Sequence, residues 1–143
     1  MAKVPSPLDC ACFNTRKTAR ALGQVYDRAL EPSGLKNTQF TALAVADAYD
    51  GISITDLSKA MEIERTTLTR NLKLLERDGL VKVGPGADGR SKTVILTAKG
   101  KRRLDGALPL WRQAHERMLR EFGAKRWKSV QKELDAMRDR LHT

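Results

Sequence analysis

The sequence predicts a mainly α-helical fold that carries one small β-hairpin. Apolar residues recur at helical spacing through most of the chain. Two short β-branched runs, 80–83 and 93–96, flank a glycine-rich loop and predict the hairpin. The length of 143 residues suits one domain with a modest core rather than two independent domains.

The first two helices are predicted at about 9–30 and 38–49. The apolar stripe of the first comprises Ala19, Leu22, Val25, Tyr26 and Leu30. The second has few charged residues, so we expect it to be buried. Ahead of both, residues 1–7 are expected to form a flexible arm, because Pro5 and Pro7 oppose a helix.

The next two helices are short and lie close together. The sequence Ser-Ile-Thr-Asp at 53–56 offers an N-cap for the first of them. After a brief polar break at 62–64, Leu68, Leu72 and Leu75 recur at i, i+4 and i+7, and this second helix ends at Gly79. Two helices joined by so short a turn predict a helix-turn-helix.

The face of the second helix opposite its leucines is polar and cationic. It carries Arg65, Thr66, Thr69, Arg70 and Lys73. Hydroxyl and guanidinium groups fit base edges and phosphates in a major groove, so Thr66, Thr67, Thr69 and Arg70 are expected to read bases. Arg65 and Lys73 are expected to bind phosphate. The alternative is a solvated helix face with no ligand.

The loop between the two strands, residues 84–92, predicts an exposed basic tip. Arg90 and Lys92 are expected there, where a long cationic side chain can enter a narrow minor groove. Asp88 is expected to hold Arg90 through a charge-assisted bond. Alone, such a loop is often only a soluble surface feature, but beside a helix-turn-helix it predicts a wing that contacts DNA.

Two further helices follow the wing. Thr97 is predicted to cap a long helix that reaches Gly123, with a kink near 105–108 because Pro109 removes a hydrogen bond. The last helix, about 124–141, has a narrow apolar stripe of Trp127, Val130, Leu134, Met137 and Leu141. A winged lobe this small cannot cover that surface, so a homodimer is expected, against the alternative of a monomer with an ordinary helical core.

Composition restricts the class of protein. The chain has 27 Lys and Arg against 17 Asp and Glu, a net charge of +10 that favours polyanions without choosing DNA over RNA or anionic lipid. Hydrophobic residues make up 41% and charged residues 31%, which is unlike a disordered chain. The sequence lacks an apolar run of ~18 residues and an apolar signal core near its start, so we expect no membrane partner and a cytoplasmic protein.

Five short motifs resemble those of the MarR family of winged-helix transcriptional regulators. They are Asp56-Leu57-Ser58, residues 67–70, residues 75–81, Asp88-Gly89-Arg90 and residues 96–100, and they cover roughly 35–105. The resemblance implies a single MarR-like domain over 1–143. Within it, about 35–97 would form the winged helix DNA-binding lobe, and about 9–34 and 98–143 the dimerisation helices. It further implies a sequence-specific homodimeric repressor on pseudo-palindromic double-stranded DNA.

Two routes of release from the operator are compatible with the sequence. Cys10 and Cys12 lie at the start of a helix, where backbone N–H groups favour a thiolate. The segment from Cys12-Phe13 to Tyr26 resembles the peroxide-sensing branch of the family, in which tyrosines hydrogen-bond the sensing thiolate. The alternatives are small structural cysteines or, less well supported, a metal site; we expect no metal and no cofactor, since Cys-x-Cys without a nearby His is a poor ligand set.

The second route is a small aromatic or phenolic effector bound between the dimer base and the winged lobe. Candidates to line that cleft are Tyr26, Phe40, Trp111 and His115. Their apolar spacing also fits ordinary core packing, and His115 fits a core histidine with a hydrogen-bond partner.

Two other functions are alternatives to that of a regulator. One is an architectural nucleic-acid binder without an effector. The other is a thiol peroxidase built on Cys12. The sequence offers no Ser-His-Asp set and no His near either cysteine, so an enzyme is not expected.

Overall fold

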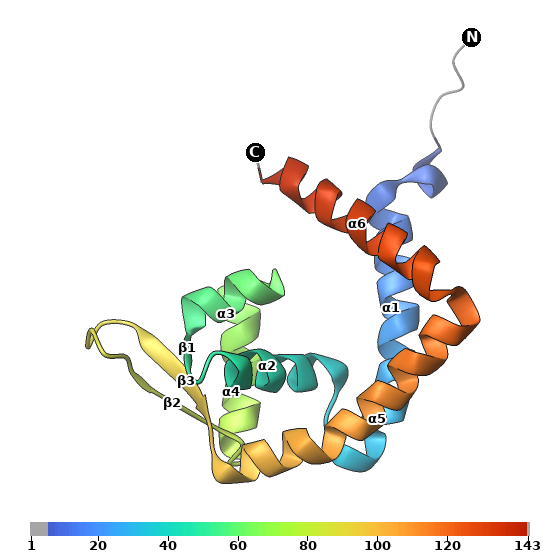
Figure 1. Ribbon diagram of the computed structural model, residues 1–143. Coiled ribbons are helices and arrows are strands. Elements are labelled where there is room, and N and C mark those ends of the chain that lie inside the picture. Colours follow the sequence, from blue (N-terminus) through green and yellow to red (C-terminus); the bar gives the residue numbers. More distant parts are fainter. Residues whose placement is uncertain (1–5, 143) are drawn as a thin grey trace.

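The computed structural model describes residues 6–142 and consists of helices and one small antiparallel sheet, which lies at one edge of the molecule (Figure 1). The main helices are α1 (Ala11–Leu30), α2 (Asn37–Ala48), α3 (Ile54–Met61), α4 (Arg65–Arg77), α5 (Ala98–Phe122) and α6 (Ala124–Leu141). The strands are β1 (Ile52–Ser53), β2 (Val81–Pro85) and β3 (Lys92–Leu96), and two 3-10 turns are η1 (Pro7–Asp9) and η2 (Glu31–Ser33). The predicted mainly α-helical fold with a hairpin is confirmed. Residues 1–5 of the predicted arm lie outside the described residues.

The segment from α2 to β3 forms the winged lobe. Its strands are arranged in the order β1-β3-β2, with Ile52 opposite Val94 and Val83 opposite Val94 on the other side. Leu43, Leu57, Leu68 and Leu75 are fully buried in its core. The short β1 was not predicted, because two residues before a helix cap carry no strand pattern of their own.

The wing and α5 are joined tightly at the base of the lobe. Thr97 caps α5 as predicted: its hydroxyl oxygen accepts from the Gly100 N–H at 3.0 Å. The same hydroxyl donates to the Gly79 carbonyl. A Cβ at Gly100 would collide with the carbonyl of Leu80, so only glycine lets α5 begin this close to β2. The end of α4, the wing and the start of α5 are therefore one packed unit.

The terminal helices are much less covered than the lobe. Residues 11–20 of α1 are all exposed, and α6 has no buried residue within the described chain. α5 runs from beneath the lobe to pack beside α1 and stays helical through Pro109; Figure 1 shows it bending along its length. At the end of α6, His142 Nε2 lies 3.0 Å from Glu62 Oε1 in the turn between α3 and α4.

Candidate nucleic-acid interface

The two sides of α4 have opposite environments. Leu68, Leu72 and Leu75 are buried and hold the helix against the lobe. The exposed side carries Arg65, Thr66, Thr67, Arg70 and Lys73, with Thr69 half-buried beside them. One surface hollow is lined by five of the residues predicted to bind DNA: Arg65, Thr66, Thr69, Arg70 and Lys73. The structure therefore brings these residues together.

The cations of this face have no acidic partners. Within residues 6–142, no carboxylate lies at ion-pair distance from Arg65, Arg70 or Lys73. The Thr69 hydroxyl donates to the Arg65 carbonyl at 2.8 Å, which uses its proton and leaves its oxygen as an acceptor. The face therefore presents positive charge and hydroxyl groups to solvent in a fixed helical arrangement.

Asp88 organises the wing tip. Asp88 Oδ1 accepts from the backbone N–H of Arg90 at 3.0 Å, and from the N–H and hydroxyl of Ser91 at 3.0 and 2.9 Å. The bond between Asp88 and Arg90 that the sequence predicted is therefore present, and its donor is the backbone N–H of Arg90. The Ser91 N–H, followed by that of Arg90, lowers the pKa of Asp88, so the carboxylate stays charged.

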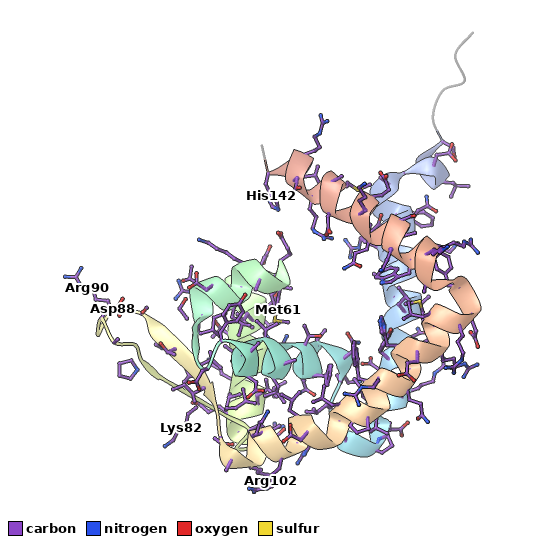
Figure 2. The ribbon with its side chains drawn as sticks, in the orientation of Figure 1. Met61, Lys82, Asp88, Arg90, Arg102 and His142 are labelled. Carbon is purple, nitrogen blue, oxygen red and sulfur yellow. The ribbon has the colours of Figure 1, made fainter. Side chains whose placement is uncertain are left out.

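Arg90 and Lys92 occupy different parts of the wing. Arg90 is exposed and projects from the tip beside Asp88 (Figure 2). Lys92 was predicted at the tip as well, but it is the first residue of β3 and pairs with Pro85. β2 extends two residues further into the loop than expected, and β3 begins one residue earlier. Backbone pairing therefore continues past the β-branched runs.

A contact that the sequence did not reveal ties the wing to α4. Glu76 Oε2 accepts from the Val83 N–H at 3.1 Å, so a side chain of α4 covers the outer edge of β2. Local periodicity shows Glu76 only as a polar position. The bond fixes the direction of the wing relative to the exposed face of α4.

Comparison with known proteins identifies this arrangement. The family model described as the MarR family matches residues 33–91, the stretch that contains α2 to the wing tip. The crystal structure of the M. tuberculosis transcriptional regulator MosR in complex with DNA is similar at 45% identity, covering 90% of this chain and 98% of that one, with a TM-score of 0.74. The chain belongs to the MarR family.

Two further proteins similar to this chain support the same family assignment. The HTH-type transcriptional regulator YwoH of Bacillus subtilis is 26% identical over 74% of this chain and 77% of its own length. A mutant MarR from E. coli complexed with operator DNA shares the fold, with a TM-score of 0.78 at 20% identity, over 86% of this chain and 89% of that one. The predicted resemblance is confirmed, and these relatives are transcriptional regulators rather than enzymes.

The residues predicted for an effector cleft meet in this MarR-family chain. The Tyr26 hydroxyl lies 3.1 Å from His115 Nδ1. The His115 ring stacks on Trp111 with centroids 5.0 Å apart, and Trp111 stacks on Phe40 at 6.0 Å. Burial raises the pKa of Tyr26, so its hydroxyl stays protonated. The four residues join α1, α2 and α5 by direct contact.

The two cysteines are exposed and free. Cys10 is the N-cap residue of α1, and Cys12 lies in its first turn. Tyr26 follows Cys12 by 14 positions on the same helix, which is about 21 Å along the axis, so the two are not neighbours within one chain. No cluster of metal-binding side chains occurs among residues 6–142, and no helix in that range is long and apolar enough to span a bilayer.

Proposed function

We propose that this MarR-family regulator is a homodimeric repressor that binds a pseudo-palindromic operator through α4 and the wing. The observation that carries the proposal is the exposed cationic face of α4, whose Arg65, Arg70 and Lys73 have no acidic partner in the described chain. Unpaired cations on a rigid helix suit a polyanion whose condensed counterions are released on binding. MosR and E. coli MarR, which share the fold, have been crystallised with DNA.

The residues divide into three roles. Thr66, Thr67, Thr69 and Arg70 contact base edges in the major groove. Arg65 and Lys73, at either end of the same face, bind the phosphates that border the groove. Arg90 enters the minor groove from the wing tip, Asp88 keeps the turn in shape, and Lys92 binds phosphate at the side of the wing.

The dimer in this proposal is formed by the terminal helices. Exposed apolar side chains there include Phe13, Val25, Val130, Met137 and Leu141. A second copy would bury them and place two α4 helices about one turn of DNA apart. Release from the operator follows when a small aromatic or phenolic effector, or oxidation of Cys12 or Cys10, changes the spacing of the two lobes.

The test begins with footprinting on the DNA that flanks the protein's own gene, repeated with peroxide and with a phenolic acid. Affinity is then measured by fluorescence anisotropy on the protected duplex. Arg70→Ala should weaken binding by about 5- to 150-fold and relax discrimination at one base pair. Arg77→Ala is the matched control, because Arg77 is an exposed arginine at the far end of α4 that pairs with Asp78.

Two results would contradict the proposal. One is an Arg70→Ala variant that binds the footprinted duplex as tightly as the unchanged protein. The other is equal affinity for the footprinted and a random duplex, which would support an architectural binder instead.

A further inference from the structure

The positive charge of the chain is concentrated outside the winged lobe. Residues 35–97, which contain the lobe, carry nine Lys and Arg against eight Asp and Glu. Residues 98–143 carry 13 Lys and Arg against six Asp and Glu. Most of the net charge of +10 therefore lies on α5 and α6, where the proposed operator contacts of α4 and the wing do not explain it.

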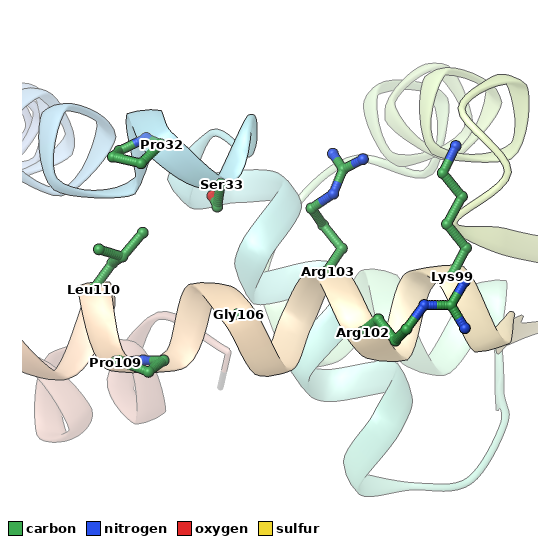
Figure 3. A pocket seen from close by; sticks show the side chains of 8 residues that line it. All are labelled: Pro32, Ser33, Lys99, Arg102, Arg103, Gly106, Pro109 and Leu110. Carbon is green, nitrogen blue, oxygen red and sulfur yellow. The ribbon is translucent and has the colours of Figure 1, made fainter.

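Some cations at the start of α5 have contacts within the chain. Lys99, Arg102 and Arg103 lie on the first half of α5, beside η2 (Figure 3). Lys99 Nζ donates to the Asp78 carbonyl at 2.9 Å, and Arg103 is half-buried. Lys99 and Arg103 therefore help to hold α5 against neighbouring segments.

Three lysines of α6 have no such contacts. Lys125, Lys128 and Lys132 follow one another at i, i+3 and i+7, so they lie on one face of the helix, and all three are exposed. Within residues 6–142, no carboxylate lies at ion-pair distance from them, and none of their ammonium groups donates a hydrogen bond. We call these three residues the lysine ridge.

The surroundings of the lysine ridge do not neutralise it. The carboxylates at its two ends are already paired, Glu121 with Arg117 at 2.8 Å and Asp135 with Arg138. The first turn of α6 holds no acidic residue, and its N-cap residue, Gly123, offers no side-chain cap. Because the N-terminal end of a helix carries a partial positive charge, cations there are disfavoured in the free protein. A bound polyanion would remove this repulsion.

The lysine ridge stays open in the proposed homodimer. The apolar stripe of α6, which includes Val130 and Met137, lies on the opposite side of the helix, so a second copy would bury the stripe and leave the ridge exposed. In Figure 1, the start of α6 forms a corner with the end of α5, on the far side of the molecule from the wing. α5 has 25 residues and is about 37 Å long. The ridge is therefore remote from the exposed face of α4.

The chemistry of the lysine ridge favours one polyanion, double-stranded DNA. Its lysines are spaced about 4.5 and 6 Å apart along the helix axis, and a duplex carries one phosphate charge per about 1.7 Å of its own axis, so each lysine can face a phosphate. Single-stranded RNA is bound largely by aromatic stacking, but Trp127 is half-buried and Arg126 lies over the Phe122 ring at 4.4 Å. An amphipathic helix binds a membrane through its apolar face, which the proposed dimer buries.

We propose that the lysine ridge binds the phosphates of a second segment of double-stranded DNA while α4 and the wing hold the operator. This contact is independent of sequence, because phosphates carry no base information. A homodimer has two ridges in addition to two α4 helices, so it bridges the operator and another stretch of DNA. The bridging rests on the proposed function, since it needs an occupied operator, whereas the contact between ridge and phosphates needs only the free protein.

The first test measures the lysine ridge without an operator. The exposed face of α4 is silenced by Arg65→Gln/Arg70→Gln/Lys73→Gln, and fluorescence anisotropy follows binding to a random duplex at low salt. Changing the three ridge lysines to Gln in that protein should weaken the remaining affinity by about tenfold or more. It should also reduce the magnitude of the slope of log affinity against log salt by about 2 to 3, because up to three phosphate contacts are lost.

The matched control removes three cations that already have carboxylate partners. Lys101→Gln/Arg117→Gln/Arg138→Gln changes the net charge by the same amount and should have a much smaller effect on affinity and on the salt slope. Circular dichroism and sedimentation velocity establish that both triple variants are folded and equally associated.

The second test detects bridging. The footprinted operator duplex is fixed to a surface, the protein is bound to it, and a labelled random duplex is added. The unchanged protein should capture the labelled duplex, and Lys125→Gln/Lys128→Gln/Lys132→Gln should capture about tenfold less. The control variant should capture as much as the unchanged protein does.

Four results would contradict different parts of these proposals. Equal losses in the ridge and control variants would reduce the effect to net charge and remove the ridge as a site. Ridge-dependent binding that is tighter for single-stranded RNA or for phosphatidylserine vesicles than for the duplex would assign the ridge to another partner and overturn the proposal. Ridge-dependent duplex binding without capture on the operator surface removes the bridging alone. An unchanged protein that binds no operator at all contradicts only the proposed function, and the first test still decides the ridge.

Discussion

The winged lobe and the terminal helices differ in how much of their apolar surface is buried within one chain. In the lobe, side chains such as Leu57 and Leu75 reach 0% exposure within one chain. In α6, Met137 is 46% exposed and Leu141 is 75% exposed, and no described residue of that helix is buried. The lobe is therefore stabilised by its own core, whereas α6 leaves its apolar side chains uncovered in the described chain, and the proposed homodimer would bury them.

The largest expected effect comes from opening the core of the lobe. Leu57→Ala should lower the free energy of unfolding by about 2–5 kcal/mol, because it removes buried methyl groups and leaves a cavity. Urea unfolding followed by circular dichroism measures it. Leu74→Ala is the control: the Leu74 residue of α4 is 39% exposed, so the substitution should lower the free energy of unfolding by less than about 1 kcal/mol. Equal losses at the two sites would mean that the lobe core is not the source of stability.

A charge in the terminal helices should act on association instead. Val130→Glu places a carboxylate on the apolar stripe of α6 and should raise the dimer dissociation constant by about 30-fold, since an unpaired charge resists burial. Sedimentation velocity across a concentration series measures the change. Ala136→Glu adds the same charge on the opposite side of α6 and should leave the dimer intact. A protein that is already monomeric at micromolar concentration would refute the comparison.

A smaller effect is expected at the wing tip. Arg90→Ala should weaken operator binding by about three- to tenfold and reduce the magnitude of the slope of log affinity against log salt by about 1, because one cation in the minor groove is lost. A salt titration of the anisotropy signal gives both numbers. Lys82→Ala, at the base of the hairpin, is the control. A slope that stays the same would remove Arg90 from the interface.

The smallest effect is expected where α1 of the terminal helices contacts α2 of the winged lobe. Asp27 of α1 accepts from the Asn37 backbone N–H at 2.7 Å and from its side-chain amide at 2.8 Å, at the start of α2. These bonds, the backbone one first, lower the pKa of Asp27 in the folded protein. The stabilisation is present above the unfolded carboxyl pKa of about 4 and is lost as pH falls through the lower folded-state value.

Asp27→Asn should accordingly reduce stability at pH 7 by less than about 1 kcal/mol, because the half-buried carboxylate is still partly screened by solvent. The difference from the unchanged protein should shrink as the pH falls below about 4. Thermal unfolding at pH 7, 5 and 3 measures it, with Glu31→Gln as a control for net charge. A difference that grows in acid would reverse the assigned sign.

Local patterns predicted most of the helices and their ends. The leucine spacing placed α4 and its buried side, and Thr97 was recognised as the cap of α5 because capping depends on residues within one turn. The same periodicity predicted that the cations of α4 are exposed. The motif order predicted the family, which the comparisons confirmed.

Several contacts between distant segments could not be predicted from the sequence. The pairing of β1 with β3, the Glu76–Val83 bond and the Asp27–Asn37 bond each join residues whose own surroundings look like ordinary polar or loop sequence. The donor atoms around Asp88 could not be predicted for a related reason. A carboxylate two residues before an arginine predicts a charge-assisted bond, but only the tight turn shows that backbone N–H groups donate it.

Because α5 is one continuous helix, a small change in its bend at Pro109 displaces the end that joins the wing by a larger distance. From Pro109 to Ala98 the helix is about 17 Å long, so a change of about 15° in its bend carries the wing end by about 4 Å. That distance is about a third of the width of a major groove, which is about 12 Å. Modest flexing beside Pro109 would therefore be enough to move α4 away from the spacing that the half-sites of the proposed operator require.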